Sequence, residues 1–421
     1  MIYGGGKVSG QAITEKYEYK TDIITSYDGH EQRIKTRQFP RHMLSFDYPA
    51  MDCLQAQWLR GLGRIRQSDA WYIPMWQSPI YLSDDFYGGT ALYIRKEDMF
   101  SLRDCEWIEI FVTDDINSST GGKNIVKQIA TLQDGGITLK FPIKKKLNKL
   151  NTFIYPLKRC SVQPMGSSSY VYSNGEQVTH NFEDLLDIPS TVVVPNKYIA
   201  NYEDYKGKNR WHLPDYLGDY EVLQIEPTWA DDEAVKLGID KATNRLDNET
   251  GLFWYDLKNT RSYDIHTYQY ILINQEMIHN MIRFFKRVSG MWKPFYYPTW
   301  ANDIQPKRTL IAGDSSISVD WINIRDYYLL NTRKKKIVIF TKNWKSYIYE
   351  IMTYTKREVG GKWEGNIVLQ EQIKQTIPLE NILMVSFLNL VRLDSDELQL
   401  NYESNVTANT TLVMREVDDL Q

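Results

Sequence analysis

Residues 71–76 read WYIPMW, and residues 295–300, which lie 224 positions later, read FYYPTW. A gapless alignment at this offset brings further identities and aromatic exchanges into register. The matched positions are Arg37 with Arg261, Phe39 with Tyr263, His42 with His266, Phe46 with Tyr270, Leu54 with Ile278 and Trp58 with Ile282. Matches at one fixed spacing indicate an internal repeat. We therefore predict that the chain contains one module twice.

The repeat continues after a small shift. Residues 108–111 (IEIF) match residues 337–340 (IVIF), and residues 137–139 (ITL) match residues 367–369 (IVL). Duplicated modules of this kind usually build symmetric or pseudo-symmetric assemblies. The pattern therefore favours a structural component over an enzyme.

Within each copy, a strand pattern precedes a helix pattern. Residues 37–46 alternate as an edge strand that tolerates Pro40, and residues 266–273 are the counterpart. Residues 51–66 and 275–289 then carry apolar side chains at helical spacing. These are Leu54, Trp58, Leu62 and Ile65 in the first copy and Ile278, Ile282, Phe285 and Val288 in the second. Gly290 follows the second helix, where a helix end favours positive φ.

Short runs of β-branched and aromatic residues with glycine turns fill the rest of each copy. The predicted fold class is mainly β with short helices (α+β): a small barrel or sandwich flanked by one helix, built twice. The predicted divisions are a lead-in arm at 1–36, a first module at 37–160, an insert at 161–250, a second module at 251–400 and a C-terminal tail at 401–421.

Composition sets the outer limits. A chain of 421 residues has room for two or three domains, and its net charge of -3 implies no global attraction to nucleic acid or anionic membranes. Aromatic residues make up 13% of the chain, which fits a β-rich protein or one rich in interfaces. The 3 cysteines are too few for a disulfide framework, and no stretch has transmembrane length. We expect a protein made in a reducing cytosol that does not insert into a membrane.

Patterns for catalysis are weak throughout. The glycine runs at 4–6 and 121–122 lack the spacing of a phosphate-binding loop, and the histidines lack metal-ligand spacing. Paired aspartates fall in polar segments without a matching base. We therefore predict no catalytic, cofactor-binding or metal-ligating residues. The lysine runs at 144–146 and 333–336 are interpreted as solvated turns or strand edges; a second interpretation places them on a channel that passes DNA.

The residues singled out are structural anchors of the two modules. They are aromatic rings, prolines and histidines, most of them at matching places in the two copies, and none of them indicates chemistry. The predicted anchors are His42, Trp58, Trp71, Pro74, Trp76, His266, Trp292, Pro298 and Trp300.

The opening of the chain resembles a family of tail proteins from tailed bacteriophages. Residues 21–33 read TDIITSYDGHEQR, and residues 37–41 read RQFPR. In that family a similar lead-in precedes a helix and a W-x-x-P-x-W segment, which stands here at 71–76 and recurs in part at 295–300. The second copy replaces the first tryptophan with Phe295 and lacks the EQR lead-in.

The resemblance implies a tail-tube-like module and a place in the virion, within the phage tail tip, as a distal tail protein or baseplate hub. Its expected partners are further copies of itself in a ring, together with tube, spike and fibre proteins, and DNA only in transit. Three two-module chains would present six similar modules to a sixfold tube. A trimer is therefore the favoured stoichiometry, and a hexamer is the alternative.

A function from another class stays open. Exposed tyrosine and tryptophan rings stack on sugars, and β-sandwiches often bind glycans. The chain would then be a carbohydrate-binding or glycan-degrading host-recognition module, the latter with a pair of carboxylates. No carboxylate pair stands at the same place in both copies, which favours the structural function.

Overall fold

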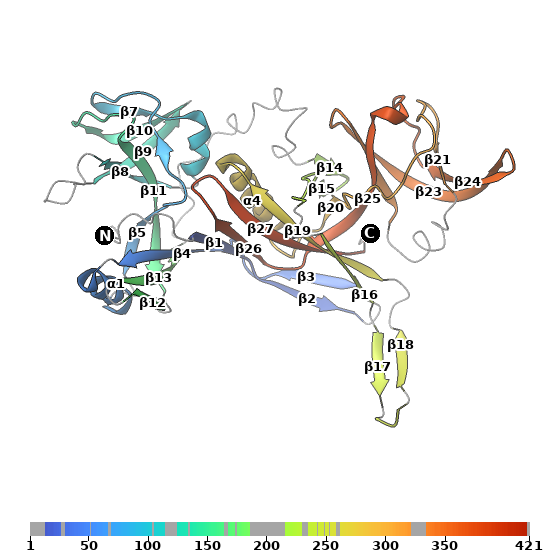
Figure 1. Cartoon of the computed structure of the whole chain (residues 1–421), viewed down its shortest axis with the longest axis horizontal. Coiled ribbons are helices and arrows are strands. Elements are labelled where there is room, and N and C mark those ends of the chain that lie inside the picture. The colour runs from blue at the N-terminus through green and yellow to red at the C-terminus, as the bar shows by residue number, and fades with distance from the viewer. Residues whose placement is uncertain are drawn as a thin grey trace.

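The fold is given by a computed structural model (Figure 1). It describes residues 13–26, 30–50, 52–65, 69–102, 105–113, 124–133, 135–163, 167–172, 175–185, 215–229, 235–241, 243–247, 249–251, 253–257, 262–320 and 334–418. Strands account for 57% and helices for 11%, which confirms the mainly β class. Residues 1–12 of the predicted lead-in and 186–214 of the predicted insert lie outside the described residues.

A continuous antiparallel sheet runs through the centre of the molecule (Figure 1). Its order, from the strand pairings, is β16–β19–β27–β26–β1–β4–β13–β12. The bounds are β16 Lys236–Asp240, β19 Tyr263–Leu272, β27 Ala408–Glu416, β26 Glu397–Tyr402, β1 Ile13–Glu18, β4 Arg41–Ala50, β13 Gly175–Asp184 and β12 Ser167–Tyr172. Because β1 lies between β4 and β26, the first and last parts of the chain share one sheet.

A first lobe extends from this sheet through β11 (Thr152–Val162), which pairs with β13. The other strands of this lobe are β5 (Ala70–Pro74), β6 (Ile80–Tyr81), β7 (Gly89–Tyr93), β8 (Trp107–Val112), β9 (Ile125–Gln133) and β10 (Gly136–Ile143). β11 pairs with β5, β6 and β8, and β9 and β10 continue from β8 to β7. The 3-10 helix η1 (Lys96–Leu102) joins β7 to β8, and the lobe has an aliphatic core of its own.

A second lobe extends through β25 (Ile382–Leu393), which pairs with β27. Its other strands are β20 (Phe295–Pro298), β21 (Ser316–Asp320), β22 (Lys336–Thr341), β23 (Ser346–Val359) and β24 (Lys362–Leu369). β25 pairs with β20 and β22, and β23 and β24 continue from β22 to β21. A short 3-10 helix, η4 (Leu379–Asn381), precedes β25, and this lobe also has its own core.

Three hairpins complete the described fold. β2 (Thr21–Thr25) pairs with β3 (Glu31–Lys35), and β17 (Thr243–Asp247) pairs with β18 (Phe253–Leu257). The β17–β18 hairpin projects away from the body of the molecule (Figure 1). β14 (Asp215–Leu217) pairs with β15 (Tyr220–Val222), which meets β20 in parallel.

Both predicted helices form: α1 spans Cys53–Ile65 and α4 spans Gln275–Val288. The Asn274 side chain caps α4 by accepting a hydrogen bond from the Met277 backbone N–H at 2.8 Å. At the other end Ser289 and Gly290 have φ of 56° and 67°, so the positive φ predicted for Gly290 is confirmed. A side chain at Gly290 would collide with Asp396, whose carboxylate accepts from the Met291 N–H at 2.9 Å.

The apolar face expected on α1 is wrong in its orientation. Leu54 and Trp58 are 74% and 46% exposed, whereas Ala56 and Leu59 are buried. The helix packs on β13 and β4 through the second pair, because the small Ala56 side chain permits close approach to the sheet. The predicted edge strand at 37–46 is also wrong, since β4 has β1 on one side and β13 on the other. Pro40 precedes this strand and therefore removes no donor from it.

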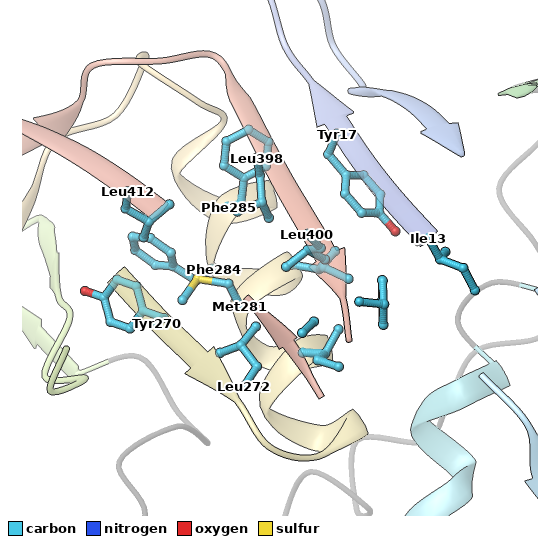
Figure 2. Packing of buried hydrophobic residues seen from close by; sticks show 14 of the residues in the cluster. Ile13, Tyr17, Tyr270, Leu272, Met281, Phe284, Phe285, Leu398, Leu400 and Leu412 are labelled. Atoms are coloured by element: carbon cyan, nitrogen blue, oxygen red, sulfur yellow. The ribbon is translucent and has the colours of Figure 1, made fainter. Parts of the chain in front are cut away.

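The main core lies between α4 and the central sheet (Figure 2). Met281, Phe284 and Phe285 of α4 face side chains from four strands of the sheet. Those that Figure 2 labels are Ile13 and Tyr17 of β1, Tyr270 and Leu272 of β19, Leu398 and Leu400 of β26 and Leu412 of β27. Because the core takes residues from both ends of the chain, its stability depends on their meeting at β1.

Candidate assembly interface

The junction between the two halves is the pairing of β1 with β26. Ile13 lies opposite Tyr402 and Glu18 opposite Glu397, while the other edge of β1 pairs with β4. One short N-terminal strand therefore joins the strands of the first half to the C-terminal hairpin of the second.

A buried carboxylate lies at the centre of this junction. Glu15 of β1 is 0% exposed and accepts hydrogen bonds from the hydroxyls of Tyr17 at 2.7 Å and Tyr402 at 2.6 Å. Nε2 of His42 lies 2.9 Å from the same carboxylate, and the Gln77 amide donates at 3.5 Å. Buried charges are tolerated where hydrogen bonds satisfy them, so this cluster links β1, β4 and β26 in one arrangement.

His42 extends the cluster to a second carboxylate. Its ring stacks on Tyr17 with centroids 4.4 Å apart, and its Nδ1 lies 3.3 Å from Asp184 of β13. Lys158 of β11 also lies 3.3 Å from Asp184. Burial alone would raise the pKa of Asp184, but His42 and Lys158 outweigh it and lower the pKa to about 2. Asp184 therefore stays ionised at neutral pH and ties the first lobe to the junction.

The β2–β3 hairpin contacts the second half of the chain through an ion pair between Glu31 and Arg392. Arg392 of β25 donates to both carboxylate oxygens of Glu31 at 2.8 and 2.9 Å, and to Asp394 at 2.8 Å. Burial alone would lower the pKa of Arg392, but these two carboxylates outweigh it and raise the pKa. Paired donation to one carboxylate fixes geometry as well as charge. Nearby, the Lys35 ammonium lies over Trp292, 5.2 Å from the ring centre.

The predicted tryptophan anchors lie in the two lobes. Trp76 and Trp300 are buried, with 4% and 3% exposed. The Trp76 ring contacts Phe111 at 5.6 Å between centroids, and the Trp300 ring stacks on Phe340 at 4.9 Å. Each therefore fastens the segment after a short strand to a neighbouring strand of its lobe.

The other predicted anchors have varied surroundings. Trp71, Pro74 and Pro298 are buried in β5 and β20, Trp292 is half-buried, and Trp58 is exposed on α1. His42 and His266 are both buried but have different neighbours: His266 lies opposite Leu237 of β16 and Met414 of β27, and it stacks on Tyr268. The structure gathers only His42 into the junction cluster.

Two strand edges of the central sheet carry no partner among the described residues. β12 pairs only with β13, and its Ser167, Ser168 and Ser169 are exposed. β16 pairs only with β19, and its Leu237 and Ile239 are 58% and 71% exposed. An unpaired edge presents rows of N–H and C=O groups that can accept another strand.

The two lysine runs differ. Lys144, Lys145 and Lys146 are exposed, which agrees with a solvated turn. Lys334 is buried and forms an ion pair with Asp264 at 2.8 Å, so the same interpretation is wrong for this residue. Burial would lower the pKa of Lys334, but Asp264 outweighs it and raises the pKa. Local sequence patterns do not predict such a buried lysine, because its partner carboxylate comes from a strand that is distant in the sequence.

Two other kinds of feature are absent from the described residues. No group of His, Cys, Asp and Glu there has the arrangement of a metal site, and no helix there is long and apolar enough to cross a membrane. No protein-family model and no curated protein sequence matches this chain.

Sequence reasoning missed Glu15, Asp184 and Arg392. A signal for Glu15 does exist: in β1, which reads ITEKYE, Glu15 falls on the same face as Ile13 and Tyr17. A charged residue on the apolar face of an alternating strand predicts a buried polar partner. Nothing local marks Arg392, because its partner Glu31 lies 361 positions away.

Stability should fall in mild acid because of buried histidines. Burial lowers the pKa of His266 to about 4, and also that of His180. In the unfolded chain histidine has a pKa near 6.5, so between pH 6.5 and 4 the unfolded chain binds more protons than the folded chain. This stability is complete above about pH 6.5 and is lost as pH falls towards 4. For His266 alone we expect a loss of about 2–3 kcal/mol between pH 7.5 and 4.5.

The measurement is urea unfolding of the parent and of His266→Phe at both pH values. The variant should lose less stability on acidification, because phenylalanine keeps the stacking on Tyr268 without titrating. Asp98 acts in the opposite direction, since burial raises its pKa to about 6, but it is common to both proteins. Equal losses in parent and variant would contradict the assignment to His266.

Proposed function

We propose that this chain carries one structural module twice and acts as a non-enzymatic virion protein of a phage tail tip, a distal tail or baseplate hub component. It would link the tail tube to spike or fibre proteins around a DNA channel. The observation that carries the proposal is the recurrence of the same strand pairings, in the same register, in both halves of the chain.

The registers coincide at the start of each half. Adding 222 to both numbers of a pair in the first half yields a pair in the second half. The coinciding pairs are Thr14↔Ser45 with Lys236↔Thr267, and Thr21↔Lys35 with Thr243↔Leu257. On this basis β1, β2, β3 and β4 correspond to β16, β17, β18 and β19.

The later strands coincide as well, with larger offsets. The coinciding pairs are Phe46↔His180 with Tyr268↔Leu412 (offsets 222 and 232), Ser169↔Gln177 with Asn401↔Asn409 (232), and Pro74↔Leu157 with Pro298↔Leu388 (224 and 231). On this basis β12 and β13 correspond to β26 and β27, and β5 and β11 to β20 and β25. Agreement at independent registers supports a duplication more strongly than sequence identities do.

This correspondence refines the gapless alignment. The helices begin 222 positions apart, at Cys53 and Gln275, whereas Trp76 and Trp300 lie 224 apart. The second copy thus has two extra residues between the start of the helix and the tryptophan segment, one of them within the longer helix α4. His42 then corresponds to Asp264 and not to His266, which accounts for the different surroundings of the two histidines.

The tryptophan contacts agree with the same correspondence. Trp76 meets Phe111 and Trp300 meets Phe340, and the two phenylalanines are the ends of the matched segments at 108–111 and 337–340. A contact kept in both copies supports an architectural function for these rings.

A duplicated module suits a connector between symmetries. Three chains offer six similar modules towards a sixfold tail tube and three identical faces towards a spike. The resemblance of the opening segment and of the W-x-x-P-x-W segment to phage tail proteins supports the same assignment. A trimeric ring is therefore the favoured assembly, and a hexamer is the alternative.

The test is native mass spectrometry of the purified protein over a range of concentrations, with negative-stain images of the same samples. We expect a trimer and closed rings. Six chains in a ring would keep the tail-tip function and change the stoichiometry. A monomer without rings at high concentration, and its absence from purified tails, would contradict the proposal.

A second candidate function rests on the projecting β17–β18 hairpin. Phe253, Trp254 and Tyr255 of β18 are 53%, 74% and 53% exposed, and exposed aromatic rings of this kind stack on sugars. The chain would then bind a host glycan. Binding on a glycan array that Trp254→Ala abolishes would favour this function, and no binding would remove it.

A further inference from the structure

The two outermost strands of the central sheet, β12 and β16, correspond to the two strands that meet at the junction within the chain. Within the chain, β26 of the second half pairs with β1 of the first. Under the proposed duplication β26 corresponds to β12, and β1 corresponds to β16. These are the two strands whose outer edges have no partner among the described residues.

We infer that the outer edge of β12 in one copy of the chain pairs antiparallel with β16 of a second copy. This inference rests on the proposed function and names its interface. The register follows from the junction: Thr14↔Asn401 becomes Lys236↔Ser169 when 222 is added to the first number and 232 is subtracted from the second. The neighbouring pairs are Leu237↔Ser168 and Gly238↔Ser167.

The exposed side chains of β16 support a covered edge. Leu237 and Ile239 take the positions that Glu15 and Tyr17 have on β1, and both of the latter are buried at the junction. In the single chain, Leu237 and Ile239 are the most apolar residues of β16 and yet are more than half exposed. Contact with a second copy would remove this area from water.

The helices support the same contact. α4 is covered where η1 of the first half reaches it, and the ring of Phe100 lies 5.6 Å from that of His279. On α1 the face that carries Leu54 and Trp58 is open. The β12 edge and the exposed face of α1 therefore lie at the same end of the sheet. They correspond to the β26 edge and the α4 face, which β1 and η1 cover at the junction within the chain.

The β12 edge has no feature that usually prevents pairing, and the β16 edge has one, the exposed Lys236, which lies opposite the uncharged Ser169 in the inferred register. Within β12 and β16 there is no proline, and the serines of β12 present no charge against a partner strand. Each contact uses a different strand on the two copies, so it is heterologous and leaves one β12 edge and one β16 edge free. Such contacts repeat from copy to copy, and they close into a ring where the rotation between neighbouring copies permits it.

The experiment is a cysteine cross-link in the full chain. Cys53 is first replaced by serine, because it is exposed and could form unintended disulfides. Cys105 and Cys160 are buried and are kept. Ser168→Cys and Leu237→Cys are then combined, since residues directly opposite on antiparallel strands have Cβ atoms close enough for a disulfide. The matched control combines Leu237→Cys with Ser169→Cys, whose side chain points to the other face of the sheet.

Under mild oxidation the Ser168→Cys/Leu237→Cys protein should form covalent multimers up to the size of the native assembly. We expect about tenfold more cross-linked product than in the control. A mixture of the two single variants should stop at a covalent dimer, because each chain then has one partner cysteine. Equal cross-linking in the control, or none in either protein, overturns the inference.

A second measurement does not depend on disulfide geometry. Leu237→Lys/Ile239→Lys places two charges on residues that the single chain leaves exposed, so folding is preserved and the assembly should dissociate. Leu150→Lys, at a residue 77% exposed in the first lobe, is the control and should stay assembled. An assembly that survives the double lysine variant contradicts the inference.

The outcomes separate this inference from the proposed function. Rings that form without the cross-link, and that resist the lysine variant, would leave the tail-tip function intact and remove the β12–β16 interface. Cross-linked open chains without rings would support the interface and contradict the ring. A protein that stays monomeric, without a cross-link, would remove both.

Discussion

Trp76→Ala is expected to lower the free energy of unfolding by about 3–5 kcal/mol, the usual cost of removing a buried tryptophan side chain. The ring is 4% exposed and packs edge-on against Tyr155, with centroids 5.0 Å apart, and against Phe111. Its loss leaves a cavity over the Tyr155 and Phe111 rings of β11 and β8, and these paired strands cannot move to close it. Urea unfolding at neutral pH measures the difference between variant and parent.

Trp58→Ala is the matched control, because it removes the same side chain from an exposed position on α1. It should change the stability of the isolated chain by less than about 1 kcal/mol. Equal losses in the free energy of unfolding for the two variants would contradict a stabilising contact of Trp76 with its lobe. Trp300→Ala should behave as Trp76→Ala does, since Trp300 stacks on Phe340 in the second lobe.

Glu15→Ala should destabilise the chain by about 3–5 kcal/mol, because it leaves buried polar partners without their carboxylate. The hydroxyls of Tyr17 and Tyr402 both donate to Glu15, and His42 also contacts it. These partners lie on β1, β26 and β4, so the variant weakens the junction between the two halves. Thermal unfolding followed by calorimetry should show a lower midpoint and less cooperative melting.

The control for this prediction is Lys16→Ala on the same strand. Lys16 forms an ion pair with Glu397 at 2.5 Å, but both side chains are about one-third exposed. Exposed pairs of this kind contribute roughly 0–1 kcal/mol. Glu15→Gln should fall between the two, because the amide keeps one acceptor oxygen. A Glu15→Ala protein as stable as Lys16→Ala would contradict a structural function for the buried cluster.

Local patterns predicted the elements well where periodicity is strong. Both helices form within two residues of the predicted ends, and the strand expected at 266–273 is β19. Amphipathic spacing and capping residues act within one or two helical turns, which explains this agreement. The orientation of α1 was mispredicted, since a helix with Leu54 and Trp58 on one face and Ala56 and Leu59 on another can pack on either.

The candidate interface depended on information that no local pattern holds. β4 read as an edge strand, and only the arrival of β1 on one side and β13 on the other makes it central. The partners of Glu31 and Lys334 are Arg392 and Asp264, which are distant in sequence. Pairing between such residues is selected by the global fold, because each buried charge requires a partner wherever the chain supplies one.

The sequence by itself determined the β-rich class, the two helices and the recurrence of WYIPMW as FYYPTW, because these follow from side-chain shape and spacing within short windows. Only the tertiary structure decided that β1 joins β26, that Glu15 is buried at their junction and that the outer edges of β12 and β16 meet no other strand of the described residues. Backbone hydrogen bonds between strands are the same for every sequence, so strand partners are selected by the packing of side chains from distant segments, which no short window contains.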